Sequence, residues 1–244
     1  MKQNILILGA TSDIARAIAH RYAREGAVIF LAARDAQKVE ADAADIRIRY
    51  QVAVTTLPFD AEDFDSHADF CTRLPAIPDV VFCVFGYLGD QKTAEKDAVM
   101  ALRIANVNYT GAVSVLSLIA NMLEEKGSGT IVGISSVAGE RGRASNYFYG
   151  SAKAGFTAFL SGLRNRLSHK GIHVLTVKPG YVNTAMTAGM QLPGPLTSQP
   201  DAVAQAVYTA VKKKKNVIYV SGVWRIIMLI IRNIPEFIFK KLKL

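Results

Sequence analysis

Short runs of Val, Ile and Leu alternate along the chain with longer segments whose apolar residues recur three or four positions apart. The runs predict buried strands, and the longer segments predict helices that cover them. Strands and helices that alternate in this way are typical of a parallel sheet. We therefore predict an α/β fold, with one Rossmann-type, doubly wound, seven-stranded parallel sheet and helices on both faces, over residues 1–222. The predicted strands are residues 5–8, 28–31, 52–57, 79–85, 130–134, 173–177 and 216–220.

The first strand leads directly into the turn Gly9-Ala10-Thr11-Ser12-Asp13-Ile14-Ala15 and an alanine-rich helix. A strand, a tight turn and a helix followed by a second strand form the unit that binds dinucleotide phosphates at a helix N-terminus. Asp13 and Ala15 replace the later glycines of a G-x-x-x-G-x-G loop. A phosphate could bind here only if the Asp13 side chain pointed away. The alternative is an ordinary strand-to-helix turn.

The end of the second strand bears on the choice of cofactor. It reads Ala32-Ala33-Arg34-Asp35, with no acidic residue at the position that would bind the ribose of NAD. Arg34 suits the 2′-phosphate of NADP, because guanidinium and phosphate form paired hydrogen bonds. The pattern favours NADP; in the alternative, Asp35 binds the ribose and the cofactor is NAD.

The segment from Ser136 to Lys153 carries the candidate chemistry. Ser136 follows a predicted strand, and Tyr149 and Lys153 lie four residues apart on the next helix, so they share one helix face. An ammonium beside a phenol lowers the pKa of the phenol, and such a tyrosine can transfer a proton at neutral pH. Without this context, the pair would describe an ordinary helix surface.

Three further features belong to the predicted site. Asp60, after the third strand, either accepts from the adenine amino group or caps a helix over residues 62–74. Gly86 ends the fourth strand, where a glycine admits close approach of a ligand. Helical patterns run over residues 93–126 and include Asn108. Residues 181–199 show little periodicity and are predicted to form a lid over the substrate.

Charge and composition narrow the class of partner. The chain has 244 residues, 50% of them hydrophobic, and a net charge of +9, which favours an anionic partner such as a nucleotide, a phospholipid or a phosphorylated substrate. Much of this charge lies in lysine runs at residues 212–215 and 240–243, which are typical of solvated faces rather than nucleic-acid sites. Cys71 and Cys83 have neither disulfide nor metal-ligand spacing. We expect no metal, no nucleic acid and a cytoplasmic location.

The C-terminal segment, residues 223–244, is apolar and basic. Arg225 and Arg232 lie seven residues apart and share a helix face, while most of their neighbours are apolar. Charges and Pro235 interrupt the run, so it is unsuited to cross a membrane. Two interpretations stay open: an interfacial element on an anionic membrane surface, peripheral on its inner face, or a helix packed on the sheet or in a dimer interface.

Taken in order, these motifs resemble the short-chain dehydrogenase/reductase family over nearly the whole chain. The resemblance implies that Ser136 binds the substrate oxygen, Tyr149 transfers the proton and Lys153 holds the nicotinamide ribose, with Asn108 fixing a relay water. Cys83-Val84-Phe85-Gly86 departs from the Asn-Asn-Ala-Gly usual in the family. From the resemblance and the patterns above, the predicted cofactor-binding residues are Gly9, Thr11, Ser12, Asp13, Ile14, Arg34, Asp60, Gly86, Tyr149, Lys153, Pro179, Gly180, Val182 and Thr184.

A narrower resemblance concerns the substrate. Four segments look like those of family members that reduce the keto-sugar of a polyprenyl phosphate: Phe85–Asp90, Asn108–Thr110, Ala138–Arg141 and Arg232–Pro235. It implies a lipid-linked ketone, with Arg141 and Arg143 as phosphate partners, a homo-oligomer and a possible partner oxidase. The alternatives are a reductase of soluble ketones, such as 3-ketoacyl or steroid-like compounds, and a nucleotide-sensing subunit without chemistry. For the two arginines, the alternative is charge on a solvent-facing loop.

Overall fold

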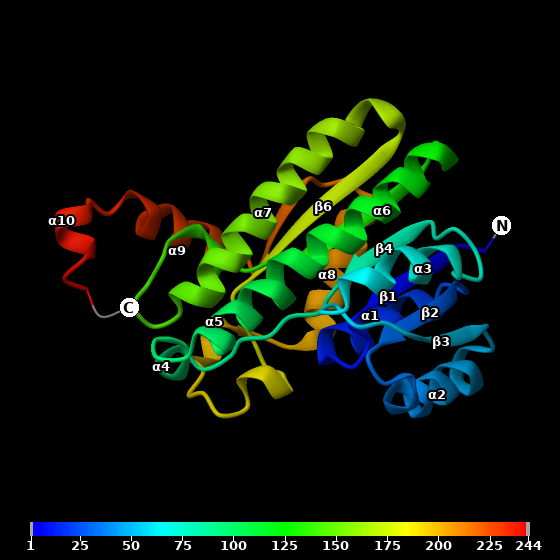
Figure 1. The fold of residues 1–244 in the computed structure, drawn as a ribbon, viewed down its shortest axis with the longest axis horizontal. Helices are drawn as coiled ribbons and strands as arrows, with labels where there is room; N and C mark the ends of the chain where they lie inside the picture. The colour runs from blue at the N-terminus through cyan, green and yellow to red at the C-terminus, as the bar shows by residue number, and fades with distance from the viewer. Residues whose placement is uncertain (1, 243–244) are drawn as a thin grey trace.

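Seven parallel strands form the central sheet of the computed structural model, which describes residues 2–242 (Figure 1). Their order across the sheet is β3-β2-β1-β4-β5-β6-β9, so the direction of winding reverses between β1 and β4. The predicted seven-stranded, doubly wound sheet is confirmed. The strands are β1 Asn4–Leu8, β2 Val28–Ala33, β3 Val54–Pro58, β4 Val80–Cys83, β5 Gly129–Ile134, β6 Ile172–Pro179 and β9 Val217–Val220.

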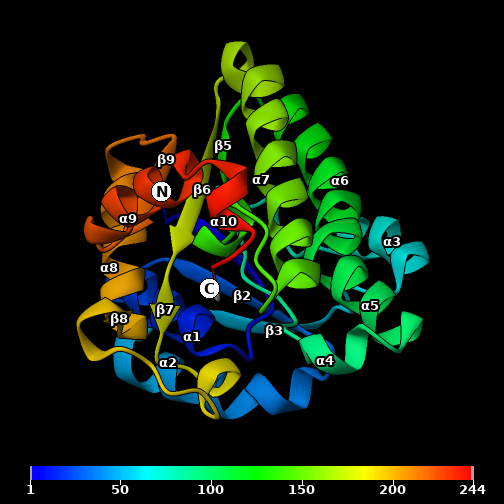
Figure 2. The ribbon, with the colours of Figure 1, turned by 90° about the vertical axis from the view of Figure 1, so that its left-hand side faces the viewer.

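Helices cover both faces of the sheet (Figure 2). On one face, side chains such as Ile18 and Val207 pack against the strands from α1 and α8. On the other, α6 and α7 contribute Ile119 and Leu160 to a second core. Both faces are therefore buried, which explains why the strands read as continuous apolar runs. The helices are α1 Asp13–Ala23, α2 Glu40–Tyr50, α3 His67–Thr72, α4 Gln91–Ala94, α5 Ala98–Ala105, α6 Gly111–Lys126, α7 Tyr147–Leu167, α8 Pro200–Lys212, α9 Val223–Asn233 and α10 Glu236–Phe239.

The helical segments differ in detail from the prediction. Residues 93–126 divide into α4, α5 and α6, because Asp97 caps a new helix and a π-helical turn, Asn106–Thr110, joins α5 to α6. The predicted helix over residues 62–74 shortens to a 3₁₀ turn and α3. Residues 181–199 contain a short strand pair, β7 (Tyr181–Val182) with β8 (Thr197–Ser198).

The C-terminal helices extend the molecule beyond the end at which α7 begins (Figure 1). Trp224 and Met228 of α9 are buried against Val137, while the outer side of this helix is apolar and exposed. Within residues 2–242, no helix is long and apolar enough to cross a membrane. Residues 243–244 of the predicted tail lie outside the described residues.

The carboxyl ends of β1, β4, β5 and β6 lie along one edge of the sheet, where ligands of open α/β sheets bind. Gly9 permits the turn after β1, since its φ is +87° and a Cβ there would lie 2.6 Å from the Phe85 backbone nitrogen. The turn and the segment after β4 can therefore approach each other closely. This contact helps to shape the crevice between the two halves of the sheet.

We expect Gly9→Ala to destabilise the protein more than Gly26→Ala. Both glycines have positive φ, but a Cβ at Gly26 would meet nothing within 4 Å. Gly26→Ala should lower the free energy of unfolding by about 1–2 kcal/mol for the backbone conformation alone. Gly9→Ala should lower the free energy of unfolding by about 1–3 kcal/mol more, because the added Cβ overpacks against Phe85. Urea unfolding measures both losses, and equal losses would contradict the close contact.

Candidate active site

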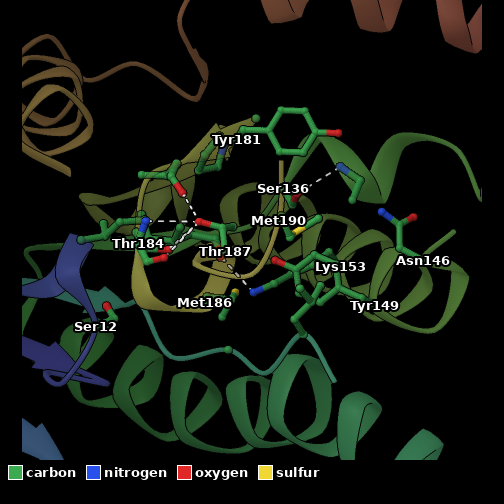
Figure 3. Close-up of a pocket in the computed structure, with 18 of the residues that line it drawn as sticks. Ser12, Ser136, Asn146, Tyr149, Lys153, Tyr181, Thr184, Met186, Thr187 and Met190 are labelled. Carbon is green, nitrogen blue, oxygen red and sulfur yellow. Dashed lines mark hydrogen bonds between the residues drawn. The ribbon is translucent and has the colours of Figure 1, made fainter. Parts of the chain in front are cut away.

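A pocket of about 780 Å³ opens at this edge and brings together most of the predicted site residues (Figure 3). It extends from the N-terminus of α1 to the N-terminus of α7. Gly9, Arg34, Asp60, Asn108 and Arg141 are not among its lining residues. The predicted residues that line it are Thr11, Ser12, Asp13, Ile14, Gly86, Ser136, Arg143, Tyr149, Lys153, Pro179, Gly180, Val182 and Thr184.

Ser136 and Tyr149 place two hydroxyl groups in this pocket. Ser136 directly follows Ser135, after β5, in an extended conformation, and its Oγ accepts the Ala138 N–H at 3.0 Å. Tyr149 lies in the first turn of α7 and lines the same pocket. The two groups could therefore bind the same substrate oxygen.

Lys153 lies one turn further along α7 and is buried. Its Nζ donates to the Ile134 carbonyl at 3.1 Å and lies 5.7 Å from the centre of the Tyr149 ring. Burial lowers the pKa of Lys153 to about 8. Burial also raises the pKa of Tyr149 to about 12, against the opposing effect of Ser136. Burial therefore dominates the pKa of Tyr149 here, and the predicted lowering by Lys153 stays a prediction.

Asn108 lies behind the pocket, in the π-helical turn before α6. Its amide donates to the carbonyls of Ile104 (2.8 Å) and Tyr87 (2.6 Å), and its Oδ1 accepts the Tyr87 N–H. These bonds fix the segment after β4, where a Cβ on Gly86 would lie 3.0 Å from Asn108 Oδ1 and 3.5 Å from Lys153 Nζ. Gly86 therefore leaves the floor of the pocket open. The role of Asn108 in holding a relay water stays a prediction.

The turn after β1 borders the pocket, and the binding of a phosphate there stays a prediction. Ser12 caps α1 by accepting the Ala15 N–H, which shows that this is a regular helix N-terminus. The Asp13 carboxylate accepts the Ala185 N–H at 2.8 Å. Its charge is therefore directed at the predicted lid, and Thr184 begins a 3₁₀ turn at the same place.

The residues predicted for the adenosine end lie outside the pocket. Arg34 is exposed and has no ion-pair partner among the described residues, whereas Asp35 caps the next turn by accepting the Gln37 N–H. Asp60 accepts the Glu62 N–H at 3.0 Å in a local turn, whereas the N-cap of the next helical turn is Asp63, so Asp60 does not cap a helix that begins at residue 62. Its predicted adenine contact is untested.

Arg141 lies elsewhere than predicted. Its guanidinium donates to the carbonyls of Ile231 (2.7 Å) and Ile234 (2.6 Å), pairs with Glu236 and covers the Phe239 ring. The carbonyl groups at the end of α9 lack helical N–H donors, and the N–H groups of Arg141 donate to them instead. It therefore holds the C-terminal segment in place, and only Arg143 of the predicted arginine pair borders the pocket.

Sequence reasoning missed several pocket residues. Trp224 reaches the pocket from α9, donates to the Leu196 carbonyl at 3.1 Å and packs where a Cβ on Gly180 would be. Met186 and Met190 reach it from the predicted lid. The two methionines in an aperiodic segment were the only signal in the sequence.

Cys83 occupies the position at which the sequence departs from the family pattern. It is buried at the end of β4, and burial raises the pKa of its thiol to about 12. The thiol is therefore held in the unreactive protonated form. Across residues 2–242, no cluster of three or more His, Cys, Asp or Glu side chains is arranged to hold a metal ion.

Comparison with known proteins agrees with this geometry. The short chain dehydrogenase pattern matches residues 3–192. An uncharacterized oxidoreductase of Mycobacterium tuberculosis is 38% identical over 241 residues, 98% of this chain and 96% of its own. A short-chain dehydrogenase from Sphingobium yanoikuyae in complex with NADPH is 26% identical, with a TM-score of 0.83 over 96% of this chain and 97% of its own. A structure described as a putative NAD(P) dependent gluconate 5-dehydrogenase from Beutenbergia cavernae, with bound NADP, is 25% identical, with the same TM-score over 92% and 97%.

Proposed function

Because the chain belongs to the short-chain dehydrogenase/reductase family, we propose that it reduces a ketone to a secondary alcohol with NADPH. The main support for this function is that one pocket contains Ser136, Tyr149 and Lys153 together with the turn that follows β1. The similar structures that contain NADPH or NADP support this cofactor. An oxidoreductase needs the cofactor and the proton donor side by side, and this pocket offers room for both.

The residues present fit a dinucleotide. The N-terminus of α1 suits a pyrophosphate, because the first N–H groups of a helix lack partners. The glycines bordering the crevice leave space that any side chain would fill. At the other end, Lys153 has N–H groups left for a ribose hydroxyl, since it makes one hydrogen bond in the described structure.

When bound, NADPH supplies the hydride for the carbonyl carbon. Ser136 and Tyr149 bind the carbonyl oxygen, and Tyr149 donates the proton that completes the alcohol. A pKa of about 12 keeps Tyr149 protonated at neutral pH, as an acid catalyst requires. A charged Lys153 favours the phenolate left after proton transfer, which makes Tyr149 a better donor as the reaction proceeds.

Tyr149→Phe should reduce kcat by roughly 10²–10⁴, because it removes the proton donor. NADPH binding, measured by fluorescence titration, should stay within a few fold of the original protein. Tyr147→Phe is the matched control, since Tyr147 lies two residues away on the same helix but outside the pocket. A panel containing a polyprenyl-phosphate keto-sugar and acetoacetyl-CoA provides the ketones. Tight NADPH binding without turnover of any ketone would favour a nucleotide-sensing subunit instead.

Arg34→Ala should weaken binding of NADPH by roughly 10- to 100-fold, since a charge-assisted hydrogen bond contributes about 1.5–3 kcal/mol. Binding of NADH should change little, because NADH lacks the 2′-phosphate. Arg24→Ala, at the far end of α1, is a control that removes another exposed cation. If the variant binds both cofactors equally more weakly, or only NADH more weakly, then Asp35 and the ribose decide the choice between NADPH and NADH.

For the substrate, we propose the keto-sugar of a polyprenyl-phosphate glycolipid. This rests on the resemblance to decaprenylphosphoryl-2-keto-erythro-pentose reductase and on a pocket that has an arginine together with methionines and a tryptophan. The alternative, a soluble 3-ketoacyl compound, is supported by 28% identity over 224 residues to acetoacetyl-CoA reductase of Allochromatium vinosum. A homo-oligomer, a partner oxidase and a cytoplasmic location stay predictions.

A lipid substrate implies contact with a membrane, and we propose the outer face of α9 for it. Ile226, Leu229 and Ile230 are each 62% exposed on that face. The inner face of the same helix is packed, so the apolar stripe is fixed outward rather than free to fold back. Basic residues of the same segment, among them Arg225, would meet anionic headgroups. Two copies pairing through this face would instead bring like charges together.

Replacing Ile226, Leu229 and Ile230 by Ser should lower partition onto phosphatidylglycerol vesicles by at least about tenfold. Full burial of each of these apolar side chains contributes about 1.5–3 kcal/mol of binding free energy. Thermal stability should stay unchanged, because these side chains are exposed. The control replaces Val99 and Leu102, exposed on α5, by Ser. Unchanged partition with a loss of oligomer in size-exclusion chromatography would assign the face to a second copy.

A further inference from the structure

Two polar atoms beside the catalytic hydroxyls are buried and have no partner within the described part of the chain. They are Nε of Arg143 and Oδ1 of Asn146, and both residues line the pocket. Leaving such an atom without a hydrogen bond costs about 1–3 kcal/mol. Two unpaired atoms of opposite polarity at one wall of a pocket therefore call for a ligand.

The Asn146 side-chain oxygen is unpaired because another residue accepts a backbone N–H at the start of α7 in its place. It is the N-cap of α7, a position at which an asparagine oxygen normally accepts a backbone N–H two or three residues on. Here it makes no such bond, and Gln91 Oε1 accepts the Phe148 N–H at 3.4 Å instead. The cap contributed by α4 thus leaves the oxygen of Asn146 available.

The Arg143 side chain also lacks hydrogen-bond partners within residues 2–242, whereas that of its neighbour Arg141 has several. Arg141 is bound to the carbonyls and the carboxylate of the C-terminal segment. Arg143 has no acidic partner among the described residues. A guanidinium that is partly removed from water and unpaired attracts an anionic oxygen.

The location of this pair separates substrate from cofactor. Ser12, at the phosphate-binding turn, and Asn146 lie at opposite ends of the view in Figure 3, with Ser136 and Tyr149 between them. A phosphate of the cofactor at Ser12 would lie on the far side of the catalytic hydroxyls. Asn146 therefore faces the part of the pocket left for the substrate, and Arg143, whose carbonyl accepts the Asn146 N–H, lines the pocket from the same loop.

We propose that Arg143 and Asn146 form a subsite for an anionic, hydroxylated group carried by the ketone. A phosphoryl or carboxyl oxygen accepts from Arg143, and a hydroxyl of the same molecule donates to Asn146. The subsite rests on the proposed reductase function and specifies its substrate as a phosphorylated or carboxylated polyhydroxy ketone. A neutral ketone would leave the guanidinium unpaired, so it would bind more weakly.

The test compares matched ketones with NADPH: dihydroxyacetone phosphate against dihydroxyacetone, and levulinate against methyl levulinate. Arg143→Met should raise KM for the two anionic ketones by roughly 10- to 100-fold, with KM for their neutral partners within about twofold. Arg143→Lys should restore part of the loss, and Arg24→Met, at an exposed cation outside the pocket, should have no effect. The phosphate and carboxylate pairs show which anion is preferred.

Asn146→Leu should raise KM for the hydroxylated ketones and spare levulinate. A uniform loss over all four ketones in either variant would overturn the subsite and indicate a structural role. Calorimetry with dihydroxyacetone phosphate and NADP⁺-loaded protein tests the subsite without turnover. If no ketone is reduced but Arg143→Met still weakens this binding, the proposed reduction fails while the subsite stands; if binding is unchanged, the subsite fails.

Discussion

Lys153 is an ammonium group buried at the edge of the sheet, 3% exposed and without an acidic partner among the described residues. Removing an ammonium from water costs several kcal/mol unless polar groups replace the water, and within residues 2–242 the Ile134 carbonyl is the one acceptor. The lowered pKa reports this cost. The position is tolerable because β5 supplies the carbonyl and α7 holds the side chain over it. Bound ribose hydroxyls would supply the acceptors that the remaining N–H groups lack, so the stability of this charge and the binding of a dinucleotide favour each other.

The parts of the site that sequence patterns predicted are those that local geometry decides. Ser136 follows β5 closely, and Tyr149 and Lys153 are one helical turn apart, so strand ends and helix spacing were sufficient to bring them together. Arg141 was misplaced because its partners lie 90 or more residues further along the chain. Trp224 was missed for the same reason, since only the folded chain brings α9 to Gly180. The burial that raises the pKa of Tyr149 could not be predicted, because it depends on the whole pocket, whereas the sequence shows the charges alone.

Glu140 explains how a distant segment comes to shape the site. Its carboxylate is almost fully buried, pairs with Lys178 at 2.7 Å, accepts from the Tyr219 hydroxyl and lies 3.7 Å from Arg232. These partners come from β6, β9 and α9, and Glu140 itself belongs to the turn that begins after Ser136. A buried charge with several partners is costly to displace, because each partner would lose its bond. The turn carrying Ser136 and the C-terminal segment are therefore fixed to each other across the predicted boundary at residue 222.

The pocket has both apolar and polar lining residues, and this restricts the orientation in which a ketone can bind. Met186, Met190 and Trp224 offer apolar surface, whereas Arg143 and Asn146 offer unpaired polar atoms. A substrate with one anionic and one apolar end could bind in two directions, but the reversed one would bury the anion against the methionines. An ionised group in such surroundings loses its hydration without replacement, at a cost of several kcal/mol. For the proposed substrate, one direction would therefore predominate and would present one face of the carbonyl to the cofactor, so that the same desolvation that selects the substrate would also decide the configuration of the alcohol.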